Sequence, residues 1–215
     1  MTPVLRAGVH AAMVGDALIL LDLEKDDYLC LPGAGGAGAA VTTGEGGALQ
    51  VEDAGVFGVL DAAGLLGPGP VMPGKPLPER PLVSVIHEPA GRPPTLPMWL
   101  DGLKAAFAVR KARKSSGVKD YLTLAGGPDG DRSPVRVAEA ARVFWRMAPW
   151  LPIEGECLVR SALLMRFFQQ RGLEADWVFG VRLWPFTAHC WVQLDGICLN
   201  DDVERLTSYT PIYCR

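Results

Sequence analysis

The sequence contains no run of apolar residues approaching the ~20 that a membrane-spanning helix needs. Its start also lacks the basic-then-apolar pattern of a secretion signal, because Asp16 and Asp22 interrupt the apolar segment. The net charge of −3 shows no basic excess of the kind that obligatory nucleic-acid binding requires. These absences predict a soluble cytoplasmic protein that binds neither membranes nor nucleic acid.

The cysteines are few, odd in number and not spaced as CxxC pairs. In a cytoplasmic chain this pattern is typical of free thiols, so we expect neither a disulfide framework nor a metal site. Two of them, Cys190 and Cys198, fall on neighbouring predicted strands and are interpreted as small core residues. The five cysteines are Cys30, Cys157, Cys190, Cys198 and Cys214.

The chain is nevertheless apolar enough to fold, and its composition divides it in two. Hydrophobic residues make up 49% of its 215 residues. Residues 1–70 contain nine acidic and two basic residues, whereas the rest of the chain has a basic excess. The stretch 67–80 holds five prolines and three glycines, which disfavour both helix and sheet. We therefore predict a domain at 1–70, a linker at 71–82 and a second domain at 83–215.

Short apolar runs separated by turn signals fill the first domain. Val9–Val14 and Ala17–Leu23 flank Gly15-Asp16, and Tyr28–Leu31 follows the turn at 25–27, which predicts a three-stranded meander. Apolar residues at helical spacing predict a helix from Val51 to Leu66. Residues 33–49 are rich in glycine and alanine and fit no element.

The second domain changes from helical to extended periodicity at Gly172. Helices followed by a small antiparallel sheet are typical of an α+β domain. The basic residues that end its first helix, at 110–114, are interpreted as a solvated helix end. The expected helices are Met98–Arg113, Pro134–Met147 and Cys157–Gln170, and the expected strands are Ala175–Leu183, Ala188–Gln193 and Ile197–Asn200.

Cys157 and His189 are the candidate catalytic pair. A helix N-terminus stabilises a thiolate and offers free N–H groups to an oxyanion, and Cys157 begins a predicted helix. His189 lies on a strand of the following sheet, which is how papain-type enzymes bring an imidazole to the thiol. These two residues alone leave open the alternative of a buried structural cysteine.

The third catalytic residue depends on the length of one hairpin loop. A two-residue loop, Asp195-Gly196, places Asp202 opposite His189, whereas a three-residue loop that includes Leu194 places Asp201 there. Asp followed by Gly suits the longer loop, so we expect the three-residue loop and Asp201.

Several sequence blocks resemble the fused B proteins of lasso-peptide biosynthesis. The blocks are Cys-Leu-x-Arg-Ser at 157–161, Arg-Gly-Leu at 171–173, Phe-x-Ala-His-x-Trp-Val at 186–192 and Leu-Asn-Asp at 199–201. The resemblance implies a papain- or transglutaminase-like cysteine peptidase that removes a leader from a precursor peptide. It implies a Cys157, His189 and Asp201 triad, no cofactor for the peptidase, and an ATP-using cyclase partner similar to asparagine synthetase.

The resemblance also covers the first domain. Residues 1–70 are similar to a leader-recognition module with a winged-helix-like fold, like that of the small PQQ-biosynthesis carrier, in which three strands precede helices. Such modules bind the leader as an added strand at the sheet edge. The residues expected to bind it are Asp27, Tyr28, Leu29, Cys30 and Leu31.

Two other functions stay open at this point. A transglutaminase-like acyl transferase would use the same triad, because hydrolysis and acyl transfer both pass through a thioester. A peptide-binding adaptor with a decayed peptidase half is the non-enzymatic alternative, although the three residues in register argue against decay.

Overall fold

The structure is a computed structural model that describes residues 4–35, 41–43, 49–51, 53–67, 75–88, 91–114, 117–125 and 129–215. The chain forms two compact units. The first consists of residues 1–77 with 180–188 and 210–214, and the second of residues 78–179 with 189–209 and Arg215. Residues 71–74 of the expected linker and most of the segment 33–49 lie outside the described residues, and the predicted division at 71–82 stays a prediction.

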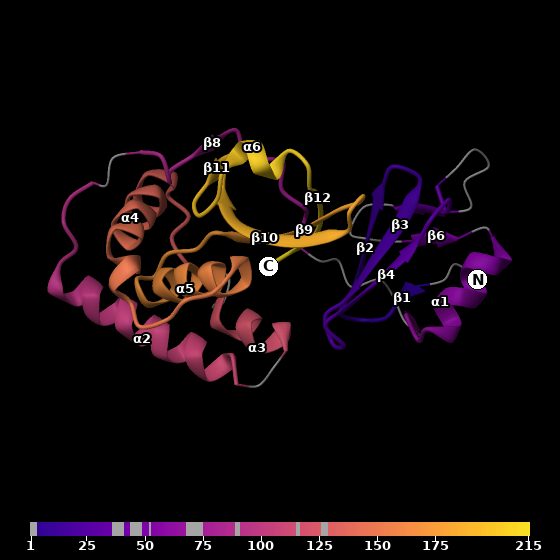
Figure 1. Cartoon of the computed structure of the whole chain (residues 1–215), viewed down its shortest axis with the longest axis horizontal. Helices are drawn as coiled ribbons and strands as arrows, with labels where there is room; N and C mark the ends of the chain where they lie inside the picture. The colour runs from indigo at the N-terminus through magenta and orange to yellow at the C-terminus, as the bar shows by residue number, and fades with distance from the viewer. Residues whose placement is uncertain are drawn as a thin grey trace. The chain divides into compact units, whose positions relative to one another are not determined.

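A three-stranded antiparallel sheet forms the main part of the first unit (Figure 1). Its strands occupy the segments that the sequence indicates, and β3 at its centre is buried along its whole length. A two-residue turn joins β2 to β3, with Gly15 in the left-handed conformation at φ +63°. The strands are β2 (Val9–Val14), β3 (Ala17–Asp22) and β4 (Asp27–Leu31), in the order β2-β3-β4.

The helix of the first unit is shorter than expected. It begins after Asp53, whose carboxylate accepts hydrogen bonds from the N–H groups of Gly55 and Val56, and Gly64 at φ +68° follows its end. Leu66 belongs instead to a strand that pairs with Leu5, so the expected helix from Val51 to Leu66 is wrong at both ends. The elements are α1 (Ala54–Ala62), β1 (Val4–Leu5), β7 (Leu66–Gly67), β5 (Val41–Thr43) and β6 (Leu49–Val51).

The second unit is built on helices around α5 (Cys157–Gln170), which packs against α2, α3 and α4 (Figure 1). Eight residues of α5 are buried, including Phe167 and Phe168 at 0% exposure, so this helix is the centre of the core. No helix in the described part of the chain is long and apolar enough to cross a membrane. The other helices are α2 (Leu96–Ala112), α3 (Val118–Leu122), α4 (Pro134–Met147) and α6 (Val203–Leu206), with 3-10 turns η2 (Thr123–Ala125) and η3 (Ala148–Trp150).

A five-stranded sheet follows α5 and confirms the expected α+β character. Its order is β12-β9-β10-β11-β8, and β8 adds a parallel pairing with β11 that the sequence did not indicate. The strands are β8 (Val83–Ser84), β9 (Asp176–Arg182), β10 (Thr187–Leu194), β11 (Ile197–Cys198) and β12 (Thr210–Cys214).

The hairpin between β10 and β11 differs from the prediction. Leu194 pairs with Ile197, so the loop has two residues, and the expected three-residue loop is wrong. Asp195 and Gly196 both have positive φ, +47° and +80°. A turn with two left-handed residues matches the right-handed twist of the strands that it joins, which is why Asp-Gly takes this shorter form.

Candidate active site

Cys157 is the first residue of α5, as predicted. The preceding residue, Glu156, has extended backbone and gives no side-chain hydrogen bond to the first turn. The N–H groups of that turn therefore lack a side-chain cap and are available to a ligand. Gly155 permits this entry, since a Cβ there would lie 2.5 Å from the Cβ of Val159.

His189 lies on β10 with its side chain only 4% exposed. Its Nε2 is 2.5 Å from Oδ2 of Asp201, and its ring is also hydrogen-bonded to the thiol of Cys157. Because Nε2 faces the carboxylate, Nδ1 is the ring nitrogen left for the sulfur. The structure thus brings together the three residues that the sequence indicates.

Asp201 reaches His189 because the strand pairing ends before it. If the pairing of β10 with β11 continued in the same register, Asp202 would lie opposite His189. The ladder stops after the N–H of Leu199 donates to the carbonyl of Val192 at 2.8 Å. The chain then turns, and the Oγ of Ser84 donates to the backbone carbonyl of Asp201 at 2.6 Å, which fixes that residue.

Asp202 has different partners. Its carboxylate is 2.9 Å from Nε2 of His87, and it also caps α6 by accepting from the N–H of Glu204. The side chain of His87 is 68% exposed. The sequence analysis therefore selected the carboxylate that contacts His189, but it did so from a loop length that the structure does not have.

A buried polar network that the sequence analysis missed joins α5 to the sheet. The Oγ of Ser161 accepts from Nδ2 of Asn200 at 2.8 Å and donates to the backbone carbonyl of Cys190 at 3.4 Å. Oδ1 of Asn200 accepts from the N–H of Val192 at 2.7 Å. Ser161 and Asn200 are 0% and 3% exposed, so this network fixes the helix of Cys157 against the strand of His189. A serine one turn after the cysteine was the only signal for it.

Aromatic rings hold the imidazole in place. The ring centroid of Tyr209 lies 5.1 Å from that of His189. The ring of Trp191 is stacked with the imidazole at a centroid distance of 6.3 Å. The indole N–H of Trp191 donates to Gln193, whose amide donates to the carbonyl of Glu79 at 2.7 Å. These contacts restrict the rotation of the imidazole, which orients it toward the thiol.

The electrostatics of the site favour a thiolate. The pKa of Cys157 is lowered to about 4, and the largest cause is the hydrogen bond with the thiol of Cys190. Burial opposes this effect, whereas the hydrogen bond and the charge of His189 lower the pKa further. A thiol that donates to the sulfur stabilises its anionic form. Burial, and after it the proximity of Cys157, raises the pKa of Cys190, so that thiol stays protonated; its Sγ also lies 3.8 Å from the Oγ of Ser161.

His189 and Asp201 form the other half of the charge arrangement. Burial by itself lowers the pKa of His189, but the hydrogen bonds to Asp201 and Cys157 reverse this effect and raise it above its usual value. Burial raises the pKa of Asp201, and the hydrogen bond to His189 outweighs this and lowers it. The site therefore favours a thiolate, an imidazolium and a carboxylate together.

Burial determines the environment of the other histidine and cysteine side chains described here. His10 is partly buried in the first unit against the ring of Tyr213, 4.3 Å away, and burial lowers its pKa to about 4. Cys198 is buried, as expected, and burial raises its pKa to about 11; Cys214 is also buried. No cluster of three side chains suited to a metal ion occurs among the residues that the structure describes.

The residues expected to bind a leader form the edge strand β4 of the three-stranded sheet. N–H groups alternate between the two sides of an antiparallel strand. Counting from the pair that closes the β2–β3 turn, the N–H of Leu29 faces β3, and those of Tyr28 and Cys30 face the open edge. The carboxylate of Asp27 accepts from the N–H of Tyr28, whereas the outward N–H of Cys30 has no partner within the described residues.

The part of the chain that holds this site matches a known protein family. Residues 100–214, which include Cys157, His189 and Asp201, match the transglutaminase-like superfamily. The chain belongs to this superfamily.

One curated protein is similar over a shorter stretch. The microcin J25-processing protein McjB of Escherichia coli is 40% identical over 48 residues, which are 22% of this chain and 23% of McjB. The chain therefore matches about a quarter of that relative's length. No solved structure matches the chain.

The low pKa of Cys157 makes its alkylation a direct test of the site. We expect iodoacetamide to label Cys157 at a rate that changes by less than about twofold between pH 5.5 and 7.5, because the thiolate predominates throughout. In Cys190→Ala the hydrogen bond from the neighbouring thiol is lost, which raises the pKa of Cys157 and makes its labelling slower at pH 5.5. Mass mapping across pH measures both. A wild-type pH profile of the labelling rate with its midpoint at pH ~8.5, the pKa of an unperturbed thiol, contradicts the prediction.

Proposed function

We propose that the protein is a cysteine peptidase that removes the leader from a ribosomally made lasso-peptide precursor, before a partner cyclase closes the ring. The observation that carries the proposal is the 2.5 Å contact of Asp201 with an imidazole that is also hydrogen-bonded to Cys157 at a helix N-terminus. Membership of the transglutaminase-like superfamily and the similarity to McjB support it.

The proposed mechanism gives each group a role. The Cys157 thiolate attacks the carbonyl carbon of the bond after the leader, and the N–H groups at the start of α5 stabilise the oxyanion. The His189 imidazolium gives its proton to the leaving amine of the core peptide, which produces a thioester with the leader. The neutral imidazole then removes a proton from water, and the hydroxide releases the leader acid. Asp201 keeps the imidazole oriented and stabilises its charged form.

Leader recognition is assigned to the first unit. The edge of β4 accepts an extended peptide through backbone hydrogen bonds, since no strand among the described residues pairs with its outward side. The proposed partners are the precursor peptide and an asparagine-synthetase-like cyclase, which would consume the amine that cleavage frees. This division assigns binding to residues 27–31 and chemistry to the second unit.

The deciding experiment incubates the full chain with a candidate precursor encoded beside its gene, with mass spectrometry of the products. We expect two products, the free leader acid and the core peptide with a free amine, whose masses sum to that of the precursor plus one water. Intact precursor in every reaction, including those supplemented with the cyclase and ATP, contradicts the proposal.

An acyl transferase is the second candidate function, since the same triad forms the same thioester. Addition of a primary amine such as methylamine separates the two. A transferase yields a leader amide whose share rises with amine concentration, whereas a peptidase yields the leader acid.

Backbone pairing at β4 predicts a specific effect of proline. Cys30→Pro removes the outward N–H without breaking the β3–β4 ladder, so leader affinity is expected to fall by at least about fivefold, the equivalent of ~1 kcal/mol for one hydrogen bond. Cys30→Ala keeps the N–H and is expected to bind the leader within about twofold of wild type. Calorimetric titration with a leader peptide measures both. Equal losses in the two variants would show that the side chain, not the backbone, makes the contact.

A further inference from the structure

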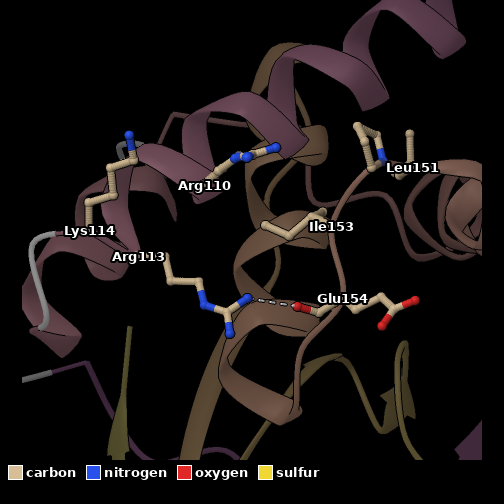
Figure 2. A pocket seen from close by; sticks show the side chains of 7 residues that line it. Arg110, Arg113, Lys114, Leu151, Ile153 and Glu154 are labelled. Carbon is tan, nitrogen blue, oxygen red and sulfur yellow. Dashed lines mark hydrogen bonds between the residues drawn. The ribbon is translucent and has the colours of Figure 1, made fainter.

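A pocket in the second unit lies between the end of α2 and the segment that leads into α5 (Figure 2). Its volume is about 660 Å³. One wall carries three basic side chains, and the other is mostly apolar. The lining residues are Arg110, Arg113 and Lys114 on the α2 side, and Leu151, Pro152, Ile153 and Glu154 on the other.

The positive charge of this pocket is largely uncompensated. Arg113 donates to the backbone carbonyl of Glu154 at 3.2 Å, which joins the two walls, while the carboxylate of Glu154 points away from the basic residues (Figure 2). Arg110 and Lys114 have no ion-pair partner in the described part of the chain. Among the described residues, the three cations therefore face one carbonyl oxygen and no carboxylate that points toward them.

The interpretation of 110–114 as a solvated helix end accounts for the charge but not for the cavity or for its apolar wall. Leu151 is buried and Ile153 half-buried beside the cations. A ligand that fits both walls has an anionic group at the end of an apolar stem, which is the chemistry of a glutamate or aspartate side chain on a peptide. Guanidinium groups bind carboxylates through paired N–H donors, which favours such a ligand over a neutral one.

The position of the pocket along the chain connects it to the candidate nucleophile. Glu154 precedes Cys157 by three residues, so their Cα atoms are at most ~11 Å apart. An extended peptide advances ~3.3 Å per residue. A substrate held at Cys157 therefore reaches the pocket with a side chain within about four residues of the reacting carbonyl.

We propose that this pocket is a subsite that binds an acidic side chain of the peptide substrate, within about four residues of the cleaved bond. The inference rests on the proposed peptidase function and extends it to substrate selection. Peptides with a carboxylate at this distance from the cut are processed in preference to neutral ones, and the preference weakens in high salt because the cations are exposed.

Kinetics with matched charge variants test the subsite. Lys114→Gln is expected to raise KM by about two- to threefold, and Arg110→Gln with Lys114→Gln by about five- to tenfold, with kcat within about twofold. Lys111→Gln removes the same charge from the same helix outside the pocket and leaves KM unchanged. The difference disappears with a precursor whose acidic residues near the cut are replaced by their amides. Equal effects of the variants at positions 111 and 114, or a difference that persists with the amide precursor, overturn the proposal.

A binding measurement separates failure of the subsite from failure of the proposed function. The Cδ1 methyl group of Ile153 in the full chain is followed by NMR during titration with acetyl-Leu-Glu-Leu amide, its glutamine counterpart and inorganic phosphate. We expect the glutamate peptide alone to shift the methyl signal, and the shift to be lost in Arg110→Gln with Lys114→Gln. A shift caused by phosphate alone overturns the subsite, and so does the lack of a shift with all three probes. A shift in a protein that cleaves no precursor retains the subsite and removes the peptidase function.

Discussion

Cys157→Ala is expected to lower the rate of leader cleavage by at least about 10⁴-fold. The neighbouring thiol of Cys190 is buried, and burial raises its pKa, so it does not supply a replacement thiolate. Cys157→Ser is expected to be nearly as inactive, since a hydroxyl does not ionise near pH 7 and cannot use the environment that stabilises a thiolate. Single-turnover kinetics with the precursor measure both. The side chain replaced is small and half-buried, so the melting temperature is expected to stay close to that of wild type.

The control for this prediction is leader affinity. Cys157 lies in the second unit, and the proposed leader-binding strand β4 lies in the first. The dissociation constant for a leader peptide is therefore expected to be the same in Cys157→Ala as in wild type. Full maturation of a precursor by Cys157→Ala with the cyclase would assign the chain to the adaptor function instead.

Asp201→Ala is expected to lower kcat by roughly 10²- to 10³-fold, because the imidazole loses the acceptor that orients it and stabilises its charged form. Asp201→Asn retains an acceptor without the charge and is expected to be intermediate. The pKa of His189 falls in both variants, since the Asp201 hydrogen bond helps to raise it. The alkaline limb of the pH–rate profile, where the imidazolium loses its proton, therefore moves to lower pH.

Asp202→Asn is the matched control, because it changes the adjacent carboxylate in the same way. Asp202 interacts with His87 and caps α6 with an oxygen that asparagine retains. We expect kcat within about threefold of wild type and no shift of the alkaline limb. Loss of cleavage in Asp202→Asn with an active Asp201→Asn would reassign the third residue of the triad.

Leader docking and catalysis are separable in this arrangement. Cys30→Pro acts on an edge strand of the first unit and should change affinity, whereas Asp201→Ala acts on the imidazole of the second and should change kcat. The alkylation of Cys157 requires no substrate at all. These three experiments can therefore fail independently, which allows each part of the proposal to be rejected without the others.

The local sequence determined most of the elements that carry the site. Proline at the first turn and a helical period fix α4 at Pro134–Met147, and the change of period after Gly172 marks the start of the sheet. Cys157 begins α5 because Gly155 lets the chain approach Val159 closely there. These features depend on neighbouring residues, so a single sequence contains enough information to predict them.

Only the tertiary structure decided which groups meet at the site. The sequence could not show that the strand pairing ends after Leu199, and this termination lets Asp201 rather than Asp202 face His189. The Ser161–Asn200 contact and the thiol of Cys190 beside Cys157 join residues 39 and 33 positions apart in the chain. Such contacts depend on how a helix packs on a sheet, which no local pattern records. The same is true of the basic pocket, because its apolar wall comes from a segment that is distant in sequence from α2.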